Sequence, residues 1–311
     1  MIKKVFIDGK AGTTGLRIYE RLESRNDIEL ITLSEELRKD INARKKALNS
    51  ADIAFLCLPD AAARESVSLI ENPDTVVIDT STAHRTNSEW AYGFPELSSD
   101  FEEKIKNSKR IAVPGCHASG FIALVYPLIK NGIISADALL SCFSITGYSG
   151  GGKKMIAEYE QDNRDALLDA PRQYGIAQSH KHLPEMTVVT GVKNSPVFCP
   201  IVASFYSGME VTVPVFASLL NEGKSIEDIK NIYRNCYNSD IVYFAEDTAE
   251  EGFMSANKLS GKDSMEISVA GNEERILLIA RYDNLGKGAS GAAIECLNIV
   301  LGTEKTNGLE I

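Results

Sequence analysis

Cys116 is the residue of this chain whose surroundings most favour covalent chemistry. It stands in the segment Val-Pro-Gly-Cys-His-Ala-Ser-Gly of residues 113–120, and apolar residues at helical spacing follow over 121–128. A thiol at a helix N-terminus feels the partial positive charge there, which favours its thiolate form. The other five cysteines are interpreted as buried thiols in apolar surroundings, where a thiol behaves as a small hydrophobe. A nucleophilic Cys116 is therefore predicted, with a structural thiol as the alternative.

Two histidines, His180 and His182, are candidates for acid–base chemistry beside such a thiol. They stand in Ser-His-Lys-His-Leu-Pro-Glu, residues 179–185. Histidine titrates near neutral pH, which suits a group that takes and returns a proton. In an extended segment alternate residues share one face, so both rings would point into one cleft. The sequence does not decide which is the base, and we favour His180. A two-histidine metal site and ordinary hydrogen-bonded histidines are the alternatives, and no metal is expected.

The other two histidines receive lesser roles, while an arginine beside one of them is a candidate substrate contact. His117 directly follows Cys116, but neighbours on a helix diverge by about 100°, so it is poorly placed to take the thiol proton. His84 is predicted to be positional. Arg85 could clamp a carboxylate or phosphate, because guanidinium binds planar oxyanions bidentately. With Ser81 it would contact the substrate; a surface salt bridge is the alternative.

A glycine-rich loop over residues 9–15, Gly-Lys-Ala-Gly-Thr-Thr-Gly, follows an apolar run and opens a helical pattern. Glycines let a backbone turn tightly and approach a pyrophosphate, whose charge the helix N-terminus stabilises. The spacing departs from G-x-G-x-x-G, so a purely structural turn is the alternative, but the place at the first strand–helix junction favours a dinucleotide. The predicted cofactor contacts are Gly9, Gly12, Thr13, Thr14 and Gly15, with Leu58 and Pro59 after a later apolar run.

The end of the second predicted strand favours NADP over NAD. A basic residue there accommodates the extra phosphate of NADP, whereas an acidic one would bind the ribose hydroxyls of NAD. Here Ser34 and Arg38 are the predicted phosphate ligands, although two glutamates lie between them. Solvated surface charges are the alternative interpretation.

The first half of the chain alternates strands and helices. Apolar runs at 5–7, 53–58 and 76–78 are typical of buried parallel strands, residues 28–33 are interpreted as a further strand, and helical patterns separate them. This alternation predicts an α/β fold with a Rossmann-type doubly wound parallel sheet. We assign residues 1–115 to a dinucleotide-binding domain, to which a closing helix within 289–311 returns.

The pattern changes in the second half. Strands are predicted at 139–146, 186–192, 197–205, 210–216 and 276–281, and helices at 154–168 and 226–233. Residues 116–288 are therefore assigned to an α+β, mostly antiparallel domain for catalysis and oligomerisation. Its glycine-rich segment 148–153 offers amides, a hydroxyl and an ammonium to an anion, or is a plain glycine turn; the predicted substrate contacts are Ser149, Gly150, Gly151 and Lys153.

The composition excludes several classes of protein. With 311 residues, of which 44% are hydrophobic and 24% charged, the chain can build two globular domains. A net charge of −10 and the lack of a long basic cluster exclude a nucleic-acid partner. No apolar run approaches the ~18 residues of a membrane span, and the first ends at Asp8, too short for a signal peptide. Scattered cysteines indicate a reducing cytoplasm.

Five segments together resemble the N-acetyl-gamma-glutamyl-phosphate reductases, and more closely the shorter of that family's two types. They are GKAGTTG at 9–15, DTSTAHR at 79–85, PGC at 114–116, HKHLPE at 180–185 and NLGKGASGAA at 284–293. The likeness runs in the family's order over nearly the whole chain. It implies the two-domain plan that this family shares with aspartate-semialdehyde dehydrogenases.

The resemblance also implies a function. The chain would reduce N-acetyl-L-glutamyl 5-phosphate to the 5-semialdehyde with NADPH in arginine biosynthesis, through a thioester on Cys116, with release of phosphate. The family's HKHLPE segment supplies the base and includes the substrate contact Glu185. Asn284 and Gly286 would lie near the nicotinamide. Members are usually oligomeric, so a homodimer or homotetramer is expected.

Three alternatives stay open at this point. The substrate could be aspartyl phosphate or an aminoadipyl phosphate, because one methylene in a pocket is worth only about 1–3 kcal/mol. The chain could be a silent NADP-binding regulator, since such a fold can bind a nucleotide without chemistry. A direct hydride transfer without a covalent step would leave a Cys116→Ser variant active.

Overall fold

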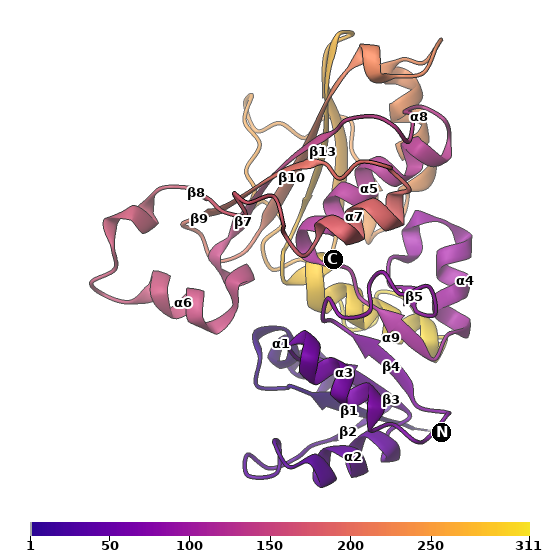
Figure 1. Cartoon of the computed structure of the whole chain (residues 1–311), viewed down its shortest axis with the longest axis vertical. Helices are drawn as coiled ribbons and strands as arrows, with labels where there is room; N and C mark the ends of the chain where they lie inside the picture. Colours follow the sequence, from indigo (N-terminus) through magenta and orange to yellow (C-terminus); the bar gives the residue numbers. More distant parts are fainter. Residues whose placement is uncertain (1) are drawn as a thin grey trace. The chain divides into compact units, whose positions relative to one another are not determined.

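The computed structural model describes residues 2–311 and divides into two compact units (Figure 1). Unit 1 comprises the chain up to Pro95 together with Ser99–Gly115 and Ala289–Leu309. Unit 2 comprises Glu96–Ser98, Cys116–Gly288 and Glu310–Ile311.

Unit 1 contains a parallel sheet of six strands in the order β2-β1-β3-β4-β6-β5. Its strands are β1 (Lys3–Asp8), β2 (Ile28–Ile31), β3 (Ile53–Leu56), β4 (Val76–Asp79), β5 (Ala91–Tyr92) and β6 (Arg110–Ala112). Its helices are α1 (Thr13–Leu22), α2 (Ile41–Ser50), α3 (Asp60–Ser68), α4 (Ser99–Asn107) and α9 (Gly291–Leu301). The predicted doubly wound sheet is confirmed.

Both faces of this sheet are covered by helices, which explains why an inner strand such as β3 is apolar without interruption. Val5 and Phe55 point into a core that includes residues of α1, α4 and α9, among them Ile18. Phe6 and Ala54, their neighbours along the strands, point into a second core with residues of α2 and α3. The last helix, α9, is thus part of the core of unit 1.

Unit 2 contains a mixed sheet of seven strands in the order β11-β12-β13-β10-β7-β9-β8. Its strands are β7 (Ser141–Gly147), β8 (Arg172–Gln173), β9 (Val197–Ala203), β10 (Met209–Phe216), β11 (Val242–Phe244), β12 (Met265–Gly271) and β13 (Arg275–Tyr282). Its helices are α5 (Cys116–Lys130), α6 (Gly152–Glu160), α7 (Leu183–Thr190) and α8 (Ile226–Cys236). Four of the six strand pairs are antiparallel, as predicted; β7–β9 and β11–β12 are parallel.

Helix α5 positions the site and is buried along most of its length. It packs against β10 and β13 and against the helices α7 and α8. Phe143, Val197, Phe216 and Leu277 lie on the opposite face of the sheet and are exposed. This second face of the sheet of unit 2 is therefore open at these four positions, whereas Glu266 and Arg281 on the same face are buried.

Two of the longer elements predicted for unit 2 are wrong. Residues 186–192 were expected to form a strand because of their β-branched residues, but they belong mainly to α7. Pro184 in its first turn and Gly191 in the left-handed conformation after its last are helix-end signals that outweigh strand propensity. The expected helix over 154–168 ends at Glu160, and a separate 3-10 turn over Ala166–Asp169 begins where Asp165 caps it.

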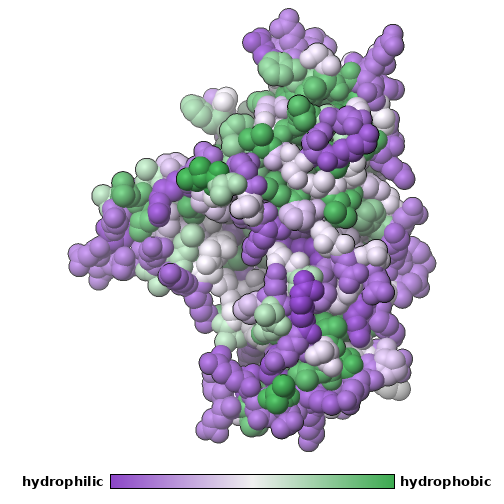
Figure 2. All heavy atoms as spheres, viewed as in Figure 1, coloured by the Kyte–Doolittle hydropathy of each residue, from purple (hydrophilic) through white to green (hydrophobic). Residues whose placement is uncertain are grey.

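The surface is largely polar. On the face drawn in Figure 2, hydrophilic side chains dominate and apolar ones reach the surface in small groups. Within residues 2–311, every helix is too short or too polar to span a lipid bilayer.

Candidate active site

Cys116 is the first residue of α5, where the sequence placed it. Its side chain is half-buried. Tyr282, at the end of β13, holds the first turn of the helix: its hydroxyl donates to the Cys116 carbonyl at 2.5 Å and accepts from the Gly120 amide at 3.0 Å. A Cβ on Gly120 would lie 2.8 Å from that hydroxyl oxygen, so glycine is required there. The backbone of the candidate nucleophile is thus tied to the sheet.

A π-helical turn over Gly286–Ser290 passes directly against Cys116. A Cβ on Gly288 would come within 3.1 Å of the Cys116 Cβ and 3.0 Å of the Asp283 carbonyl oxygen. Such turns are frequent at functional sites. Here the glycine allows the close approach of the two segments.

His180 and His182 come together beside α5, with ring centroids 4.7 Å apart. The expected extended segment is wrong, however: residues 181–182 form a turn, and His182 is the N-cap of α7. His117 joins them, its ring centroid lying 5.8 Å from that of His180 and 5.6 Å from that of His182. Three imidazoles therefore share one site next to Cys116.

His180 is held as a neutral hydrogen-bond donor. Its Nδ1 accepts from the His182 backbone N–H at 3.2 Å. A neutral imidazole whose Nδ1 accepts carries its proton on Nε2. Burial and the charge of Lys181 lower the pKa of His180, which favours this neutral form. His182 is therefore the better candidate for the base, in place of the His180 favoured from the sequence.

His117 is fully enclosed, and burial, with the charges of His180 and Lys181, lowers its pKa to about 3. In the unfolded chain its pKa would be about 6.5. The unfolded state therefore binds more protons between these values, so stability falls as the pH drops from about 6.5 towards 3.

We expect a His117→Gln variant to lose less stability on acidification than the wild type, by up to about 1.4 kcal/mol per pH unit in this window. Urea unfolding of both proteins at pH 7 and at pH 5 measures the difference. Equal losses for the two would contradict a neutral His117 in the folded state.

The glycine turn after β7 and the segment after β13 are joined by Asn284. Its side-chain nitrogen donates to Ser149 Oγ at 3.0 Å, and its oxygen accepts from the Gly208 amide at 2.9 Å. A Cβ on Gly150 would lie 3.4 Å from the same amide nitrogen. The structure thus brings a predicted cofactor contact, Asn284, together with the predicted substrate contact Ser149.

The other predicted residues of unit 2 differ in exposure. Lys153, in the first turn of α6, is exposed. Glu185, in the first turn of α7, is buried, and its charge acts on the Tyr282 hydroxyl. Gly286 lies so close to the Lys262 carbonyl that a Cβ would come within 2.0 Å of it.

Unit 1 contains a cavity of about 540 Å³ at the carboxyl ends of β1 and β2. The lining includes Gly9, Lys10 and Ala11 of the glycine loop and Leu58 after β3. Gly9 has φ +90°, and a Cβ there would lie 2.3 Å from the Cys57 carbonyl oxygen. Gly15 is as crowded, 2.5 Å from the Gly9 carbonyl oxygen, whereas a Cβ on Gly12 would stay 3.4 Å away.

Substitutions in this loop should separate folding from ligand binding. Gly9→Ala is expected to lower the free energy of unfolding by about 1–3 kcal/mol from backbone strain alone. Gly12→Ala should leave stability unchanged and weaken only dinucleotide binding, because Gly12 has ordinary backbone angles and space for a methyl group. Thermal unfolding and a fluorescence titration with NADPH measure both. An unchanged melting temperature for Gly9→Ala would contradict the backbone strain inferred at Gly9.

The residues beside the basic part of the cavity lining differ in part from the predicted phosphate ligands. Its lining includes Arg38, Lys39 and Arg44 but, of the described residues, not Ser34, which is exposed. Arg38 forms an ion pair with Glu35 at 2.6 Å. A phosphate bound here would compete with that carboxylate.

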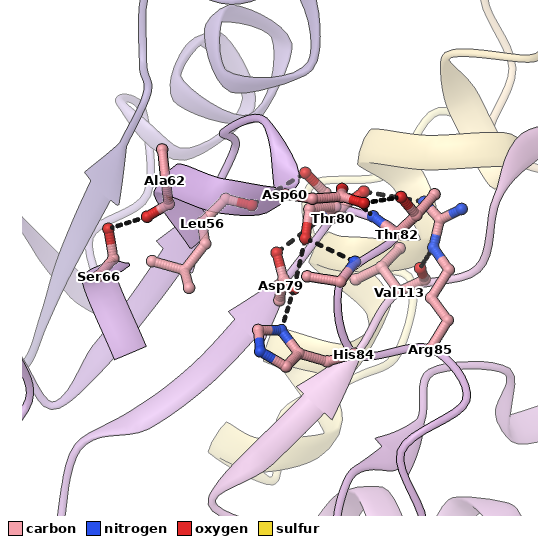
Figure 3. Close-up of polar contacts among 12 residues, drawn as sticks. Leu56, Asp60, Ala62, Ser66, Asp79, Thr80, Thr82, His84, Arg85 and Val113 are labelled. Atoms are coloured by element: carbon pink, nitrogen blue, oxygen red, sulfur yellow. Dashed lines mark hydrogen bonds and ion pairs between the residues drawn. The ribbon is translucent and has the colours of Figure 1, made fainter. Parts of the chain in front are cut away.

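The loop after β4 is held by a buried carboxylate (Figure 3). Asp79 accepts from the Ser81 hydroxyl at 2.7 Å and lies 2.6 Å from His84 Nδ1. The His84 ring stacks on Trp90 with centroids 4.0 Å apart. Arg85 donates to the carbonyls of Val113 and Thr80 at 2.8 and 2.9 Å. His84 thus has the positional role predicted, and Ser81 helps to shape the loop that carries Arg85.

Sequence reasoning missed three side chains of the site: Tyr174, Ser144 and Tyr282. His117 Nε2 lies 2.6 Å from the Tyr174 hydroxyl, and Nδ1 lies 2.6 Å from Ser144 Oγ. No local pattern marks these residues, because their partners are distant in the chain. Each stands near a motif, Tyr174 six positions before His180, Ser144 four before the segment 148–153 and Tyr282 two before Asn284, but nearness to a motif does not assign a role.

Two family models match the chain. The semialdehyde dehydrogenase NAD binding domain matches residues 4–108, and the semialdehyde dehydrogenase dimerisation domain matches residues 116–284. Among solved structures, aspartate semialdehyde dehydrogenase II of Vibrio cholerae complexed with ASA is similar with a TM-score of 0.74 at 15% identity, over 97% of this chain and 99% of that one. The Candida albicans aspartate semialdehyde dehydrogenase with NADP has a TM-score of 0.63 at 13% identity, over 97% and 99%. These likenesses show a shared fold.

Proteins related in sequence identify the family more narrowly than the shared fold does. The chain is 42% identical over 318 residues to N-acetyl-gamma-glutamyl-phosphate reductase 2 of Nostoc sp., which covers 98% of this chain and 99% of that protein. It is 43% identical over 309 residues to the N-acetyl-gamma-glutamyl-phosphate reductase of Brucella ovis, over 97% and 100%. With its two semialdehyde dehydrogenase domains, this chain therefore belongs to the N-acetyl-gamma-glutamyl-phosphate reductase family.

Proposed function

We propose that this chain reduces N-acetyl-L-glutamyl 5-phosphate to N-acetyl-L-glutamate 5-semialdehyde with NADPH, releasing phosphate, as a step of arginine biosynthesis in the cytoplasm. One observation carries the proposal: Cys116 begins α5 beside three histidines, in a chain 42–43% identical to named reductases over nearly its whole length. The six cysteines are free thiols, which suits a reducing compartment.

The first half of the reaction is acyl transfer to Cys116. The thiolate attacks the acyl carbon, a carbon–sulfur bond forms, and the bond to the phosphate oxygen breaks, so phosphate leaves. His182 takes the thiol proton before the attack and gives it to the leaving phosphate. Covalent catalysis divides a difficult reduction into two easier steps and keeps the acyl group in place between them.

The second half converts the thioester to the aldehyde. NADPH supplies the hydride for this reduction. His180, a donor through Nε2, stabilises the oxyanion that develops on the former carbonyl. When the carbon–oxygen double bond forms again, the carbon–sulfur bond breaks and Cys116 returns as the thiolate. Preorganised donors at a developing oxyanion are a large part of such catalysis.

The residues around the cavity of unit 1 fit a dinucleotide. Gly9 and Gly15 leave no room for a Cβ at the loop, so backbone amides and the start of α1 can face a pyrophosphate. Gly12, Thr13 and Thr14 would contribute from the same loop. Arg38 and Lys39 would bind the additional phosphate that distinguishes NADP.

The remaining assignments keep their predicted roles. Ser81 and Arg85 in unit 1 are proposed anion contacts, as are backbone groups of Gly150 and Gly151 in unit 2. Within the same unit, Ser149, Lys153 and Glu185 are proposed to contact the substrate, and Asn284 with Gly286 to lie on the cofactor side. Pro59, the N-cap of α3, is proposed to approach the cofactor with Leu58.

The experiment that tests the function is the capture of its intermediate. The purified protein is mixed with N-acetylglutamyl phosphate without NADPH, quenched in acid and digested. Mass spectrometry should find an N-acetylglutamyl thioester on the peptide that contains Cys116. In the reverse assay, phosphate-dependent NADP reduction should favour N-acetylglutamate semialdehyde over aspartate and aminoadipate semialdehydes. A faster turnover of either competitor would reassign the substrate.

The chain is also proposed to form a homo-oligomer through the open face of the sheet of unit 2. Phe143, Val197 and Phe216 are 45%, 56% and 62% exposed there, and the family model matched by this region describes a dimerisation domain. A second copy seated on this face would remove these side chains from water.

We therefore expect Phe143→Glu to shift the protein towards the monomer in sedimentation velocity. Val188→Glu is the matched control, because Val188 is 60% exposed on α7, away from this face. An unchanged assembly for Phe143→Glu would exclude this face.

A further inference from the structure

His117 connects two hydroxyl groups through a buried ring. Its side chain is only 3% exposed. Nδ1 lies 2.6 Å from Ser144 Oγ on β7, and Nε2 lies 2.6 Å from the hydroxyl of Tyr174. Both distances are short for hydrogen bonds of this kind, and both ring nitrogens are occupied. Ser144, His117 and Tyr174 thus form one continuous series of hydrogen bonds.

The ring of His117 is neutral in this series. Burial, with the charges of His180 and Lys181, lowers its pKa to about 3, far below the pH at which an enzyme works. A neutral imidazole has one N–H and one accepting nitrogen. Two arrangements are therefore open, in which either Nε2 or Nδ1 carries the proton.

Ser144 favours the arrangement with the proton on Nε2. The serine is fully buried on β7. Within residues 2–311, its hydroxyl contacts no hydrogen-bonding group other than His117 Nδ1. A buried hydroxyl proton without an acceptor is costly, so Ser144 donates to Nδ1. The ring proton then lies on Nε2 and is donated to the Tyr174 oxygen.

This arrangement leaves the Tyr174 proton available to a third group. Tyr174 lies within electrostatic reach of Cys116: burial, and to a lesser degree the charge of a Cys116 thiolate, raise the pKa of Tyr174. The tyrosine therefore keeps its proton, and negative charge on Cys116 favours that protonated form. A hydroxyl that accepts from His117 and still holds its proton is a donor towards negative charge.

We propose that His117 is a positioning residue that turns the Tyr174 hydroxyl into a hydrogen-bond donor for negative charge at Cys116, first on the thiolate and then on the oxyanion formed from its acyl group. No net proton transfer along the series is required. The proposal rests on the function proposed above and adds a donor that is independent of His180 and His182.

Four variants separate this role from simple core packing. Tyr174→Phe removes the donor and is expected to lower kcat about 10²-fold, with KM changed far less. In His117→Gln the side-chain amide reaches the place of Nε2, so kcat should stay within about threefold of the wild type. In His117→Asn the amide reaches only the place of Nδ1, and kcat should fall as in Tyr174→Phe. The double variant His117→Asn/Tyr174→Phe should be no slower than either single variant, because both remove one interaction.

Two further measurements do not depend on turnover. The pH profile of Cys116 alkylation by iodoacetamide should move to higher pH in Tyr174→Phe, because the thiolate loses a donor. The neighbouring groups that titrate or carry charge include His117, His180, Lys181, His182, Glu185 and Tyr282, and all are unchanged in this variant. Nitrogen-15 NMR of the wild type should show His117 neutral and protonated on Nε2 at pH 6.

The possible results distinguish the proposed role of His117 from core packing and from a failure of the proposed function. A proton on Nδ1, an imidazolium at pH 6, or wild-type kcat and alkylation in a folded Tyr174→Phe variant would overturn the role of His117. Equal losses in His117→Gln and His117→Asn would assign it to packing. If instead the wild type fails to reduce N-acetylglutamyl phosphate, the proposed function fails, and the alkylation and NMR results still decide the hydrogen-bond arrangement.

Discussion

Replacement of Cys116 by serine is expected to lower kcat for acyl-phosphate reduction at least about 10³-fold. Serine keeps the size of the side chain, but its hydroxyl is not ionised at neutral pH, even at a helix N-terminus. The thioester therefore cannot form. The rate of NADPH oxidation in the presence of N-acetylglutamyl phosphate measures the loss.

The control for this variant is Cys236→Ser. Cys236 is half-buried at the end of α8, and burial raises the pKa of its thiol, so it stays protonated. This substitution should leave turnover near that of the wild type. NADPH binding to the Cys116→Ser protein, followed by fluorescence, should also persist, because the cavity assigned to it belongs to unit 1. Retained reductase activity in Cys116→Ser would indicate direct hydride transfer without a covalent step.

Replacement of His182 by alanine is expected to lower kcat about 10²–10⁴-fold, the usual contribution of a general base. The thiol proton would then have no acceptor of suitable geometry, since His180 Nδ1 already accepts from a backbone amide and His117 bonds two hydroxyls. Alkylation of Cys116 at neutral pH should slow in parallel. Added imidazole should restore part of both rates.

His180→Ala gives the comparison for this assignment. It removes a donor and not the base, so kcat should fall while alkylation of Cys116 at neutral pH changes little and imidazole gives no rescue. The reverse pattern, with rescue in His180→Ala only, would exchange the roles of the two histidines.

The fold of unit 1 could be predicted well because its signals are local. Each strand of a parallel sheet covered on both sides is a continuous apolar run, as in Ile53–Leu56. The glycine loop is local in part: Gly15 is crowded by Gly9, but Gly9 itself is crowded by Cys57, which follows β3. No strand or helix was predicted from the sequence over residues 91–112. The strands there are too short for a periodic pattern, since β5 has two residues and β6 has three.

Unit 2 was harder to predict because strand propensity and helix-end signals favour different structures for the same residues. The run Met186–Thr190 has residues of high strand propensity, yet it forms a helix between Pro184 and Gly191. Packing against α5 and the end signals outweigh propensity in so short a segment. This helix also brings His180 and His182 together by a turn, where alternation along a strand had been expected.

The order of residues was sufficient to predict a cysteine at a helix start and a glycine loop before the first helix, because each depends on neighbours a few positions away, and the resemblance of five segments gave the family. The three-dimensional arrangement alone decided how these groups are held. His117 meets Tyr174 across 57 positions, and Tyr282 clamps Cys116 across 166. Such pairs form only when a mixed sheet and its helices pack together, and packing between distant segments leaves no periodic trace in a sequence.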